Sequence, residues 1–180
     1  SQAFDPNGNL VARIEAAGVT NYTWDARNRL ITVSGPTGTT SFRYDPFGRR
    51  VEKTINGLTT TFQYDGPRII RETGPAGEVV YLRTLEDDEI LSRTDTTGTT
   101  LFYLSDAIGS TVALTTTEGV LADQYTYEAF GKTQATVAGT STRFKFTSRE
   151  EDETGLYYYR ARWMDPATGA VLATQPVAAG

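Results

Sequence analysis

The chain has 180 residues, carries a net charge of −5, and contains neither cysteine nor histidine. The missing cysteines exclude disulfides and thiolate metal sites, and the missing histidines exclude imidazole ligands, serine-type triads and the usual general base at neutral pH. The acidic charge and the single, scattered lysines and arginines argue against a nucleic-acid-binding protein, which needs a basic surface. No apolar run approaches the length of about 18 residues that a membrane-spanning helix needs.

The composition favours strands along the whole chain. There are 17 glycines and ten tyrosines but a single methionine, and threonine is abundant. Threonine and tyrosine suit a pleated, half-exposed surface, whereas good helix formers are sparse. We therefore predict an all-β chain.

A repeat of about twenty residues begins at the N-terminus. Four aspartates stand twenty residues apart, each directly after an aromatic residue: Asp5, Asp25, Asp45 and Asp65. A second series, of glycines spaced 19 to 21 residues apart, interleaves with the first: Gly18, Gly38, Gly57, Gly77, Gly98 and Gly119. A fixed period of this length is typical of repeat proteins, in which each repeat is one supersecondary unit.

Short alternating runs lie between the two markers, at residues 39–44 (TTSFRY), 59–64 (TTTFQY), 78–83 (EVVYLR) and 99–104 (TTLFYL). Alternation over five or six residues, bounded by turn-forming residues, predicts half-buried strands. Each unit is therefore expected to be one antiparallel hairpin, made of a strand, an Asp-x-x-Gly turn, a second strand and a looser glycine turn.

The turn chemistry is explicit in residues 44–50 (YDPFGRR). The carboxylate of Asp45 can accept a hydrogen bond from a backbone N–H two residues on, Pro46 fixes φ, and Gly48 supplies a positive φ. Residues 55–59 carry Asn-Gly, the strongest short hairpin signal. The repeated aspartates are therefore interpreted as turn caps.

The recurring aromatic residues admit two interpretations. They could stack against sugar rings, as in a glycan-binding module, or they could pack across strands and line the inside of a shell. Packing is the favoured interpretation. The residues concerned are Phe42, Tyr44, Phe62, Tyr64, Tyr81, Phe102, Tyr103, Tyr125 and Tyr127.

The unit x-Tyr-Asp-x-x-Gly-Arg resembles the YD repeats of Rhs proteins, teneurins and the BC components of Tc toxins. Residues 103–132 (YLSDAIGSTVALTTTEGVLADQYTYEAFGK) and 143–177 (RFKFTSREEDETGLYYYRARWMDPATGAVLATQPV) resemble the Rhs repeat-associated core that closes such arrays. The resemblance implies a YD-repeat array over 1–102 and a core-like region over 103–180, as one continuous unit. Further turn positions are then expected at Asp106, Gly109, Gly131, Asp165 and Gly169.

The resemblance also implies a function. The hairpins would form a curled ribbon, part of a spiral β-shell that encapsulates and delivers a toxin carried C-terminally on the same polypeptide. The partners would be this cargo, the rest of the shell, and a secretion-system or target-cell component. The protein would be secreted or at the cell surface, although this segment shows no signal peptide, and it would need no cofactor and bind no nucleic acid.

In the family the core is an aspartyl-type autoprotease, which depends on an arginine and on downstream Asp-Pro-x-Gly motifs. Arg162 matches the arginine, but Gln175 stands where the first aspartate is expected. An amide does not titrate in the useful range. Self-cleavage would therefore need another acid, such as Asp165 or Glu153.

Two acidic runs complete the list of candidates. Residues 150–153 (EEDE) could chelate a metal such as Ca²⁺, but a solvated acidic turn is the favoured interpretation. Residues 85–89 (LEDDE) are interpreted as a polar hairpin loop. Three functions therefore stay open: a shell segment, a self-cleaving core, and a glycan-binding module.

Overall fold

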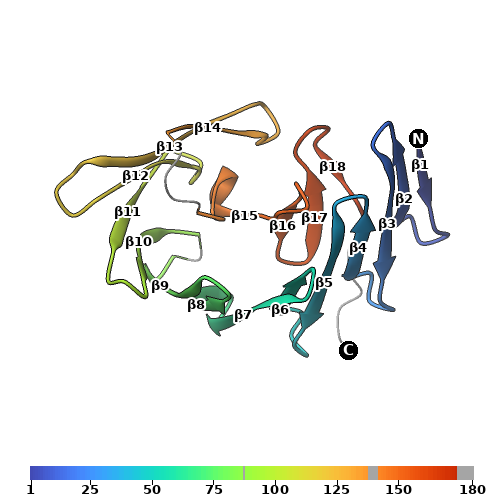
Figure 1. Cartoon of the computed structure of the whole chain (residues 1–180), viewed down its shortest axis with the longest axis horizontal. Coiled ribbons are helices and arrows are strands. Elements are labelled where there is room, and N and C mark those ends of the chain that lie inside the picture. Colours follow the sequence, from blue (N-terminus) through green and yellow to red (C-terminus); the bar gives the residue numbers. More distant parts are fainter. Residues whose placement is uncertain (87, 138–141, 174–180) are drawn as a thin grey trace.

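The computed structural model describes residues 1–86, 88–137 and 142–173, and this part of the chain forms two antiparallel sheets (Figure 1). The larger sheet, called the wall here, has 14 described strands in sequence order, so each strand pairs with its neighbours along the chain. They are β1 (Gln2–Phe4), β2 (Leu10–Glu15), β3 (Gly18–Trp24), β4 (Leu30–Gly35), β5 (Gly38–Tyr44), β6 (Arg50–Ile55), β7 (Leu58–Asp65), β8 (Arg68–Gly74), β9 (Gly77–Arg83), β10 (Ile90–Asp95), β11 (Thr100–Ser105), β12 (Thr111–Thr115), β13 (Leu121–Tyr127) and β14 (Thr133–Val137).

The second sheet belongs to residues 142–173, called the inner segment here. Its four described strands are β15 (Glu150–Glu151), β16 (Tyr157–Tyr159), β17 (Arg162–Asp165) and β18 (Ala170–Val171), and a 3₁₀ turn, η1 (Phe146–Ser148), precedes them. The wall curls around this sheet, which lies on the concave side (Figure 1). The predicted all-β ribbon of sequential hairpins is confirmed, and the ribbon is open, with β1 and β14 at its two edges.

Among the described residues there is no helix with the length and apolar character needed to cross a membrane.

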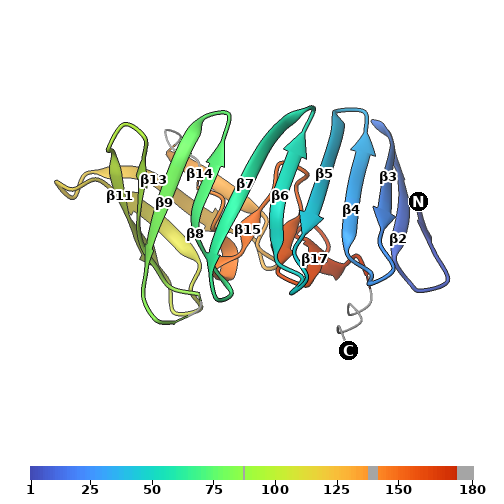
Figure 2. The same ribbon diagram turned by 90° about the horizontal axis from the view of Figure 1, so that it is seen from below.

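Two kinds of turn join the strands of the wall, and they alternate between the two ends of the strands (Figure 2). The glycine turns at Gly18, Gly38, Gly57 and Gly77 are the tighter kind, which corrects the expectation that they are looser, whereas Gly98 and Gly119 lie in turns of the longer kind. Ile55 pairs directly with Leu58, and the two residues between them, Asn56 and Gly57, both have positive φ, of 48° and 86°. Two such residues let the chain reverse within two positions. The aspartate turns are longer. Their extra backbone N–H groups have no partner on the facing strand and donate to the aspartate carboxylate instead.

The turns of Asp5, Asp25 and Asp45 share one hydrogen-bond pattern, illustrated here by Asp45. Its backbone N–H donates to the Arg49 carbonyl at 2.9 Å, and the Gly48 N–H donates to the Asp45 carbonyl at 3.0 Å. Its Oδ1 accepts the Arg49 N–H at 2.9 Å, and its Oδ2 accepts Arg49 Nε at 2.6 Å. The carboxylate therefore satisfies both the turn backbone and the arginine that ends the motif.

A β-bulge follows the turns at Asp5, Asp25, Asp45, Asp65 and Asp106, whereas β10 and β11 pair in register across the Asp95 turn. Tyr44 pairs with Arg50 whereas Arg43 pairs with Glu52, so Val51 is an extra residue on β6. The extra residue shifts the alternation of inward-facing and outward-facing side chains along the strand by one position. Residues three positions apart, here Arg50 and Lys53, consequently both face the concave side and are buried.

A ladder of side-chain bonds ties each hairpin to the one before it. Trp24 Nε1 donates to the Leu10 carbonyl at 2.7 Å, and Tyr44 Oη to the Leu30 carbonyl at 2.8 Å. Tyr64 Oη donates to the Arg50 carbonyl at 2.8 Å, and Arg83 Nε to the Ile69 carbonyl at 2.7 Å. In each case the donor lies 14 residues after the acceptor; the donor is the aromatic residue of the motif in the first three and Arg83 in the fourth.

The core lies between the wall and the inner segment. One cluster joins the concave face of β2–β5 to the inner segment, through Leu10, Tyr22, Leu30, Val33, Phe42, Leu156, Tyr158, Trp163 and Leu172. A second joins β7–β12 to the start of the inner segment, through Phe62, Ile69, Tyr81, Ile90, Leu101, Tyr103, Leu114 and Phe144. Burial of these apolar side chains is the main force that holds the inner segment against the wall.

Candidate functional site: the contact between wall and inner segment

The centre of the contact is a buried group of charges. Arg50 and Lys53 come from β6 of the wall, and Glu150 and Asp152 from the inner segment. The side chains of Arg50 and Asp152 are both 0% exposed and that of Lys53 is 1% exposed. Charges are almost never buried to this degree unless they are paired.

The pairing is specific. Arg50 Nη1 donates to Asp152 Oδ2, and Arg50 Nη2 donates to Glu150 Oε2. Lys53 Nζ donates to Asp152 Oδ1 at 2.5 Å and also to Glu153. Asp152 therefore pairs with both cations of the wall, so this one aspartate fixes the position of the inner segment on the wall.

Aromatic rings enclose the Arg50 guanidinium. Its Cζ lies 4.5 Å from the ring centroid of Tyr158, 4.9 Å from that of Phe62 and 5.5 Å from that of Trp163. Arginine tolerates such surroundings because its planar cation stacks on ring faces and is weakly hydrated. The rings also exclude water, which strengthens the ion pairs inside.

The electrostatics follow from this enclosure. Burial alone would raise the pKa of Asp152, but the positive charges of Arg50, Lys53 and Arg143 outweigh it and hold this pKa well below its usual range. Burial alone would lower the pKa of Arg50, but Asp152 and Glu150 raise it well above its ordinary value. Both groups therefore stay ionised at physiological pH.

Two further ion pairs join the wall to the inner segment. Arg143 Nε lies 2.6 Å from Glu72 Oε2, and Arg13 Nη2 lies 2.7 Å from Asp165 Oδ2. Tyr81 Oη donates to the other oxygen of Glu72 at 2.8 Å, and the ring of Tyr81 packs edge-on against Phe144 at 5.0 Å. Polar contacts between the wall and the inner segment are therefore found along the wall from β2 to β9.

The acidic run at 150–153 is where the sequence-based interpretation was wrong. Glu150 and Asp152 are buried, not solvated, because they neutralise the cations of β6. Glu151 pairs with Lys145 at 2.6 Å, and Glu153 with Lys53. Within the described residues no group of three or more acidic side chains is arranged to hold a metal ion.

The sequence carried a signal for this site that was missed. Arg50 pairs across its hairpin with Tyr44, and the matching positions of the other hairpins hold buried apolar residues: Leu10, Leu30, Ile69 and Ile90. Lys53 likewise occupies the position of Val33 in the preceding repeat. Two cations at positions that are apolar elsewhere in the array indicate a partner with opposite charge.

The turn residues proposed from the sequence all lie at turns. The Oδ1 atoms of Asp5, Asp25 and Asp106 accept backbone N–H groups two and four residues on, at 2.8–3.0 Å. Asp65 differs, because it flanks a two-residue turn and its carboxylate pairs only with Arg68, at 3.0 Å. The glycines concerned all have positive φ: Gly48, Gly109, Gly131 and Gly169.

The residues considered for self-cleavage are not brought together in the described part of the chain. Arg162 is exposed at the start of β17, and Gln175 lies outside the described residues. Of the alternative acids, Asp165 caps the turn at 165–169 and pairs with Arg13, and Glu153 pairs with Lys53.

The aromatic residues mostly pack in the core. Phe42, Phe62, Tyr81, Tyr103 and Tyr125 are buried. Their burial confirms the packing interpretation for these five, since a sugar ring could not reach them. Among the aromatic residues named from the sequence, Phe102 is exposed, at 41%.

The fold and this contact define a class of protein: an open wall of YD-type hairpins that curls around its own following segment. Residues 4–40 and 24–55 match the RHS repeat family. Over 98% of its length the chain is 33% identical to the tRNA3(Ser)-specific nuclease WapA of Bacillus spizizenii and to the tRNA nuclease WapA of Bacillus subtilis. Residues 4–55 therefore carry repeats of the RHS family, as the resemblance of the motifs predicted.

Solved structures share the fold. The chain superposes on the crystal structure of TcdB2-TccC3-Cdc42 with a TM-score of 0.77 and 19% identity, over 96% of this chain and 10% of that one. It superposes on the Photorhabdus luminescens Tc holotoxin pore with a TM-score of 0.73 and 18% identity, over 96% of this chain and 9% of that one. The chain spans 8% of the length of the WapA relatives, so it corresponds to a small part of each.

Proposed function

We propose that the chain is a segment of an RHS shell whose wall encloses and helps deliver a toxin carried on the same polypeptide. The observation that supports this most directly is the buried pairing of Arg50 and Lys53 with Asp152 on the concave face. Buried cations of the wall pair here with a later stretch of the same polypeptide. This is the arrangement expected of a shell that holds polypeptide on its inside. The nuclease names of the WapA relatives are consistent with a toxin as the cargo.

We propose the same division of the chain as the motifs imply. Residues 1–102 would contribute hairpins to the shell, and residues 103–180 would form the core-like region that closes it, whose first strands, up to β14, continue the wall. The remaining shell repeats would continue from the open edges of the ribbon, because the unpaired backbone N–H and C=O groups of an edge strand can pair with a further strand. Export to the cell surface or medium, with a secretion-system or target-cell component as a further partner, completes this proposal.

Protection of the cargo from protease tests the proposal. The complete polypeptide in which this segment occurs would be treated with a nonspecific protease under native conditions, and the cargo region followed by mass spectrometry. The cargo expressed alone is the control. We expect the enclosed cargo to survive at protease concentrations that digest the free cargo, and equal digestion of the two would overturn the proposal.

The same sample addresses self-cleavage. Because the Gln175 amide cannot act as an acid or base, we propose that Arg162 and Gln175 do not form a cleaving pair. The intact mass of the complete polypeptide is then expected to correspond to one uncut chain. Two fragments with a boundary downstream of residue 173 would contradict this.

A further inference from the structure

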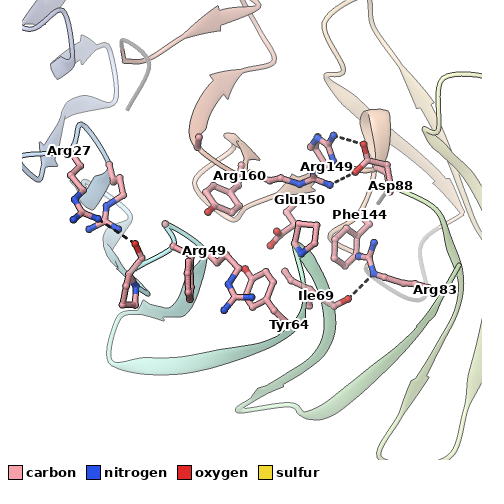
Figure 3. A pocket seen from close by; sticks show the side chains of 18 residues that line it. Arg27, Arg49, Tyr64, Ile69, Arg83, Asp88, Phe144, Arg149, Glu150 and Arg160 are labelled. Atoms are coloured by element: carbon pink, nitrogen blue, oxygen red, sulfur yellow. Dashed lines mark hydrogen bonds and ion pairs between the residues drawn. The ribbon is translucent and has the colours of Figure 1, made fainter. Parts of the chain in front are cut away.

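The two faces of strand β9 have different surroundings. On the concave side, Tyr81 is buried and packs edge-on against Phe144 of the inner segment, with the ring centroids 5.0 Å apart. Figure 3 shows Arg83, the next inward-facing residue, beside Phe144 in the pocket between the wall and the inner segment, and its Cζ lies 4.7 Å from the Phe144 ring centroid. Val80 and Leu82 alternate with these residues, so they point to the convex side, where they are 39% and 59% exposed.

Other repeats hold polar residues at the positions of Val80 and Leu82. In each of β3, β5, β7, β9, β11 and β13, a buried aromatic residue lies between two residues that face outwards. These outward-facing pairs are polar on β3, β5, β7 and β13 but apolar on β9 and β11. Apolar residues at positions that are polar elsewhere in the array indicate a contact surface. In chain order the pairs are Asn21 and Thr23, Ser41 and Arg43, Thr61 and Gln63, Val80 and Leu82, Phe102 and Leu104, and Gln124 and Thr126.

The exposed apolar side chains of β9, β10 and β11 form one patch, called the outer patch here. Ser92 of β10 lies directly opposite both Leu82 and Phe102. It is only 5% exposed, because side chains opposite each other across a sheet are in contact and these two are much larger than serine. Exposed apolar residues that stand alone are normal, but a contiguous patch marks an interaction surface. The residues of the outer patch, which are 39–59% exposed, are Val80, Leu82, Leu91, Phe102 and Leu104.

The size of the outer patch suits the centre of a small protein interface. At about 200 Å² for a fully exposed large side chain, its residues offer roughly 400 Å² of apolar surface. Two such patches in contact would bury about 800 Å² in total, to which the polar rim adds. Small specific interfaces bury about 1,200 Å². The outer patch is therefore large enough to form the centre of a weak dimer.

The rim of the outer patch carries both signs of charge. Arg71 lies directly opposite Val80 and pairs with Glu78 at 3.1 Å, and the side chains of the pair are 43% and 37% exposed. Since each of these charges already has an opposite partner, the pair gives no advantage to a strongly acidic or strongly basic partner. A copy of the chain related by a two-fold axis presents the same pair in reversed order, so Arg71 of each copy can face Glu78 of the other.

A groove of about 350 Å³ adjoins the outer patch. Ile70, Val80, Leu82 and Leu85 are among the residues that line it. Leu85 is 91% exposed, so it projects from the surface beside the groove. In a two-fold dimer each copy can insert Leu85 into the groove of the other, because such an interface uses the same surface of both copies. The outer face is therefore complementary to itself in shape as well as in charge.

We propose that the outer patch binds a second copy of the chain, in a two-fold dimer centred on Leu82 and Phe102. The proposal rests on the outer face of the wall alone and does not depend on the function proposed above. In a shell, the convex face of the wall lies on the outside, so the same contact would join two shells back to back.

Sedimentation velocity of the 180-residue chain tests the proposal, at protein concentrations from about 5 to about 300 μM. We expect a reversible equilibrium of monomer and dimer with a dissociation constant in the micromolar range, since the interface is small. Salt raised from about 0.05 to about 0.5 M should leave the dimer unchanged or strengthen it, because salt screens the repulsion between two chains of net charge −5 but does not oppose apolar burial. A monomer at every concentration, or a dimer that salt dissociates, would overturn the proposal.

Two variants locate the interface. Leu82→Gln and Phe102→Thr introduce the residues that β7 carries at the equivalent positions, Gln63 and Thr61, so the fold already accepts them there. Each variant is expected to weaken the dimer about three- to tenfold, and the double variant by more than about tenfold. Leu58→Gln is the matched control, because it makes the same change on a side chain that is 62% exposed and lies outside the outer patch. Equal effects of Leu58→Gln and Leu82→Gln would show that the outer patch is not the interface.

A third variant separates the outer patch from the free edge of β1, through which a dimer could also form. The amino group of Ser1 and the backbone N–H of Ile14 each donate to the carbonyl of the other at 2.8 Å, so the next residue, Gln2, directs its N–H towards the open edge. Gln2→Pro removes this donor and is expected to leave the dimer unchanged. Loss of the dimer in Gln2→Pro, together with its retention in the double variant of the outer patch, would assign the dimer to the edge and overturn the proposal. Circular dichroism confirms that each variant compared is folded.

Discussion

Arg50 Nη1 donates to Asp152 Oδ2 across 102 residues of sequence, and neither side chain is exposed to solvent. Lys53 approaches the other oxygen of the same carboxylate. A buried ion pair gives less net stability than its geometry suggests, because both groups lose their hydration, but removal of one partner leaves an uncompensated buried charge. The pair therefore specifies where the inner segment docks more than it strengthens the docking.

Asp152→Asn tests this asymmetry. The variant leaves Arg50 and Lys53 buried with half their neutralisation, and we expect the free energy of unfolding to fall by about 3–5 kcal/mol, measured by urea denaturation. Glu52→Gln is the matched control, since Glu52 pairs at 3.3 Å with Arg43, whose side chain is 75% exposed. That variant should lose less than about 1 kcal/mol. Equal losses in the two variants would show that burial of the pair has no energetic consequence.

The pH dependence has a defined sign. The folded-state pKa of Asp152 lies below its unfolded value of about 3.9, so its contribution is fully present above that value and declines as pH falls towards the folded pKa. We expect this contribution to be constant between about pH 7 and pH 5 and to decrease below about pH 4. Urea denaturation of wild type and Asp152→Asn across this range isolates it from other carboxylates. The two curves should converge at low pH, and parallel curves would contradict the assignment.

The aspartate turns offer a pair of variants with the same chemistry and different surroundings. Asp45 bonds the turn backbone and Arg49, whereas Asp65 is 67% exposed and pairs only with Arg68. Asp45→Ala should therefore cost about 1–2 kcal/mol of unfolding free energy, since it leaves a turn N–H unpaired and removes the carboxylate that accepts from Arg49 Nε. Asp65→Ala should cost less than about 1 kcal/mol. Urea denaturation distinguishes them, and a larger loss in Asp65→Ala would refute the turn-cap role.

The local features of the fold could be predicted from the sequence because they repeat. The aspartate and glycine series gave the hairpins, their turns and the open ribbon, since a turn depends on four or five adjacent residues. The docking of the inner segment depends on pairs such as Arg50 and Asp152, far apart in sequence, which local rules do not connect. The acidic run at 150–153 was consequently expected in solvent. Its partners could be found only from the observation that Arg50 replaces the leucine or isoleucine of neighbouring repeats.

Steric crowding separates two glycines that have nearly the same backbone conformation. Gly48 has φ of 84° and Gly131 has φ of 86°. A Cβ at Gly48 would meet nothing within 4 Å, whereas a Cβ at Gly131 would lie 2.5 Å from ring atoms of Phe146. Both alanine variants bear the cost of a left-handed residue, about 1–2 kcal/mol.

Gly131→Ala should therefore lose about 1–3 kcal/mol more unfolding free energy than Gly48→Ala, because the Phe146 ring must move. This ring packs against Tyr127 at 5.6 Å and Tyr157 at 6.4 Å, so its movement would loosen the contact between β13 and the inner segment. Urea denaturation gives the difference, and amide exchange at residues 142–149 shows where it arises. Equal losses in the two variants would mean that Phe146 can move without cost and does not fasten the start of the inner segment to the wall.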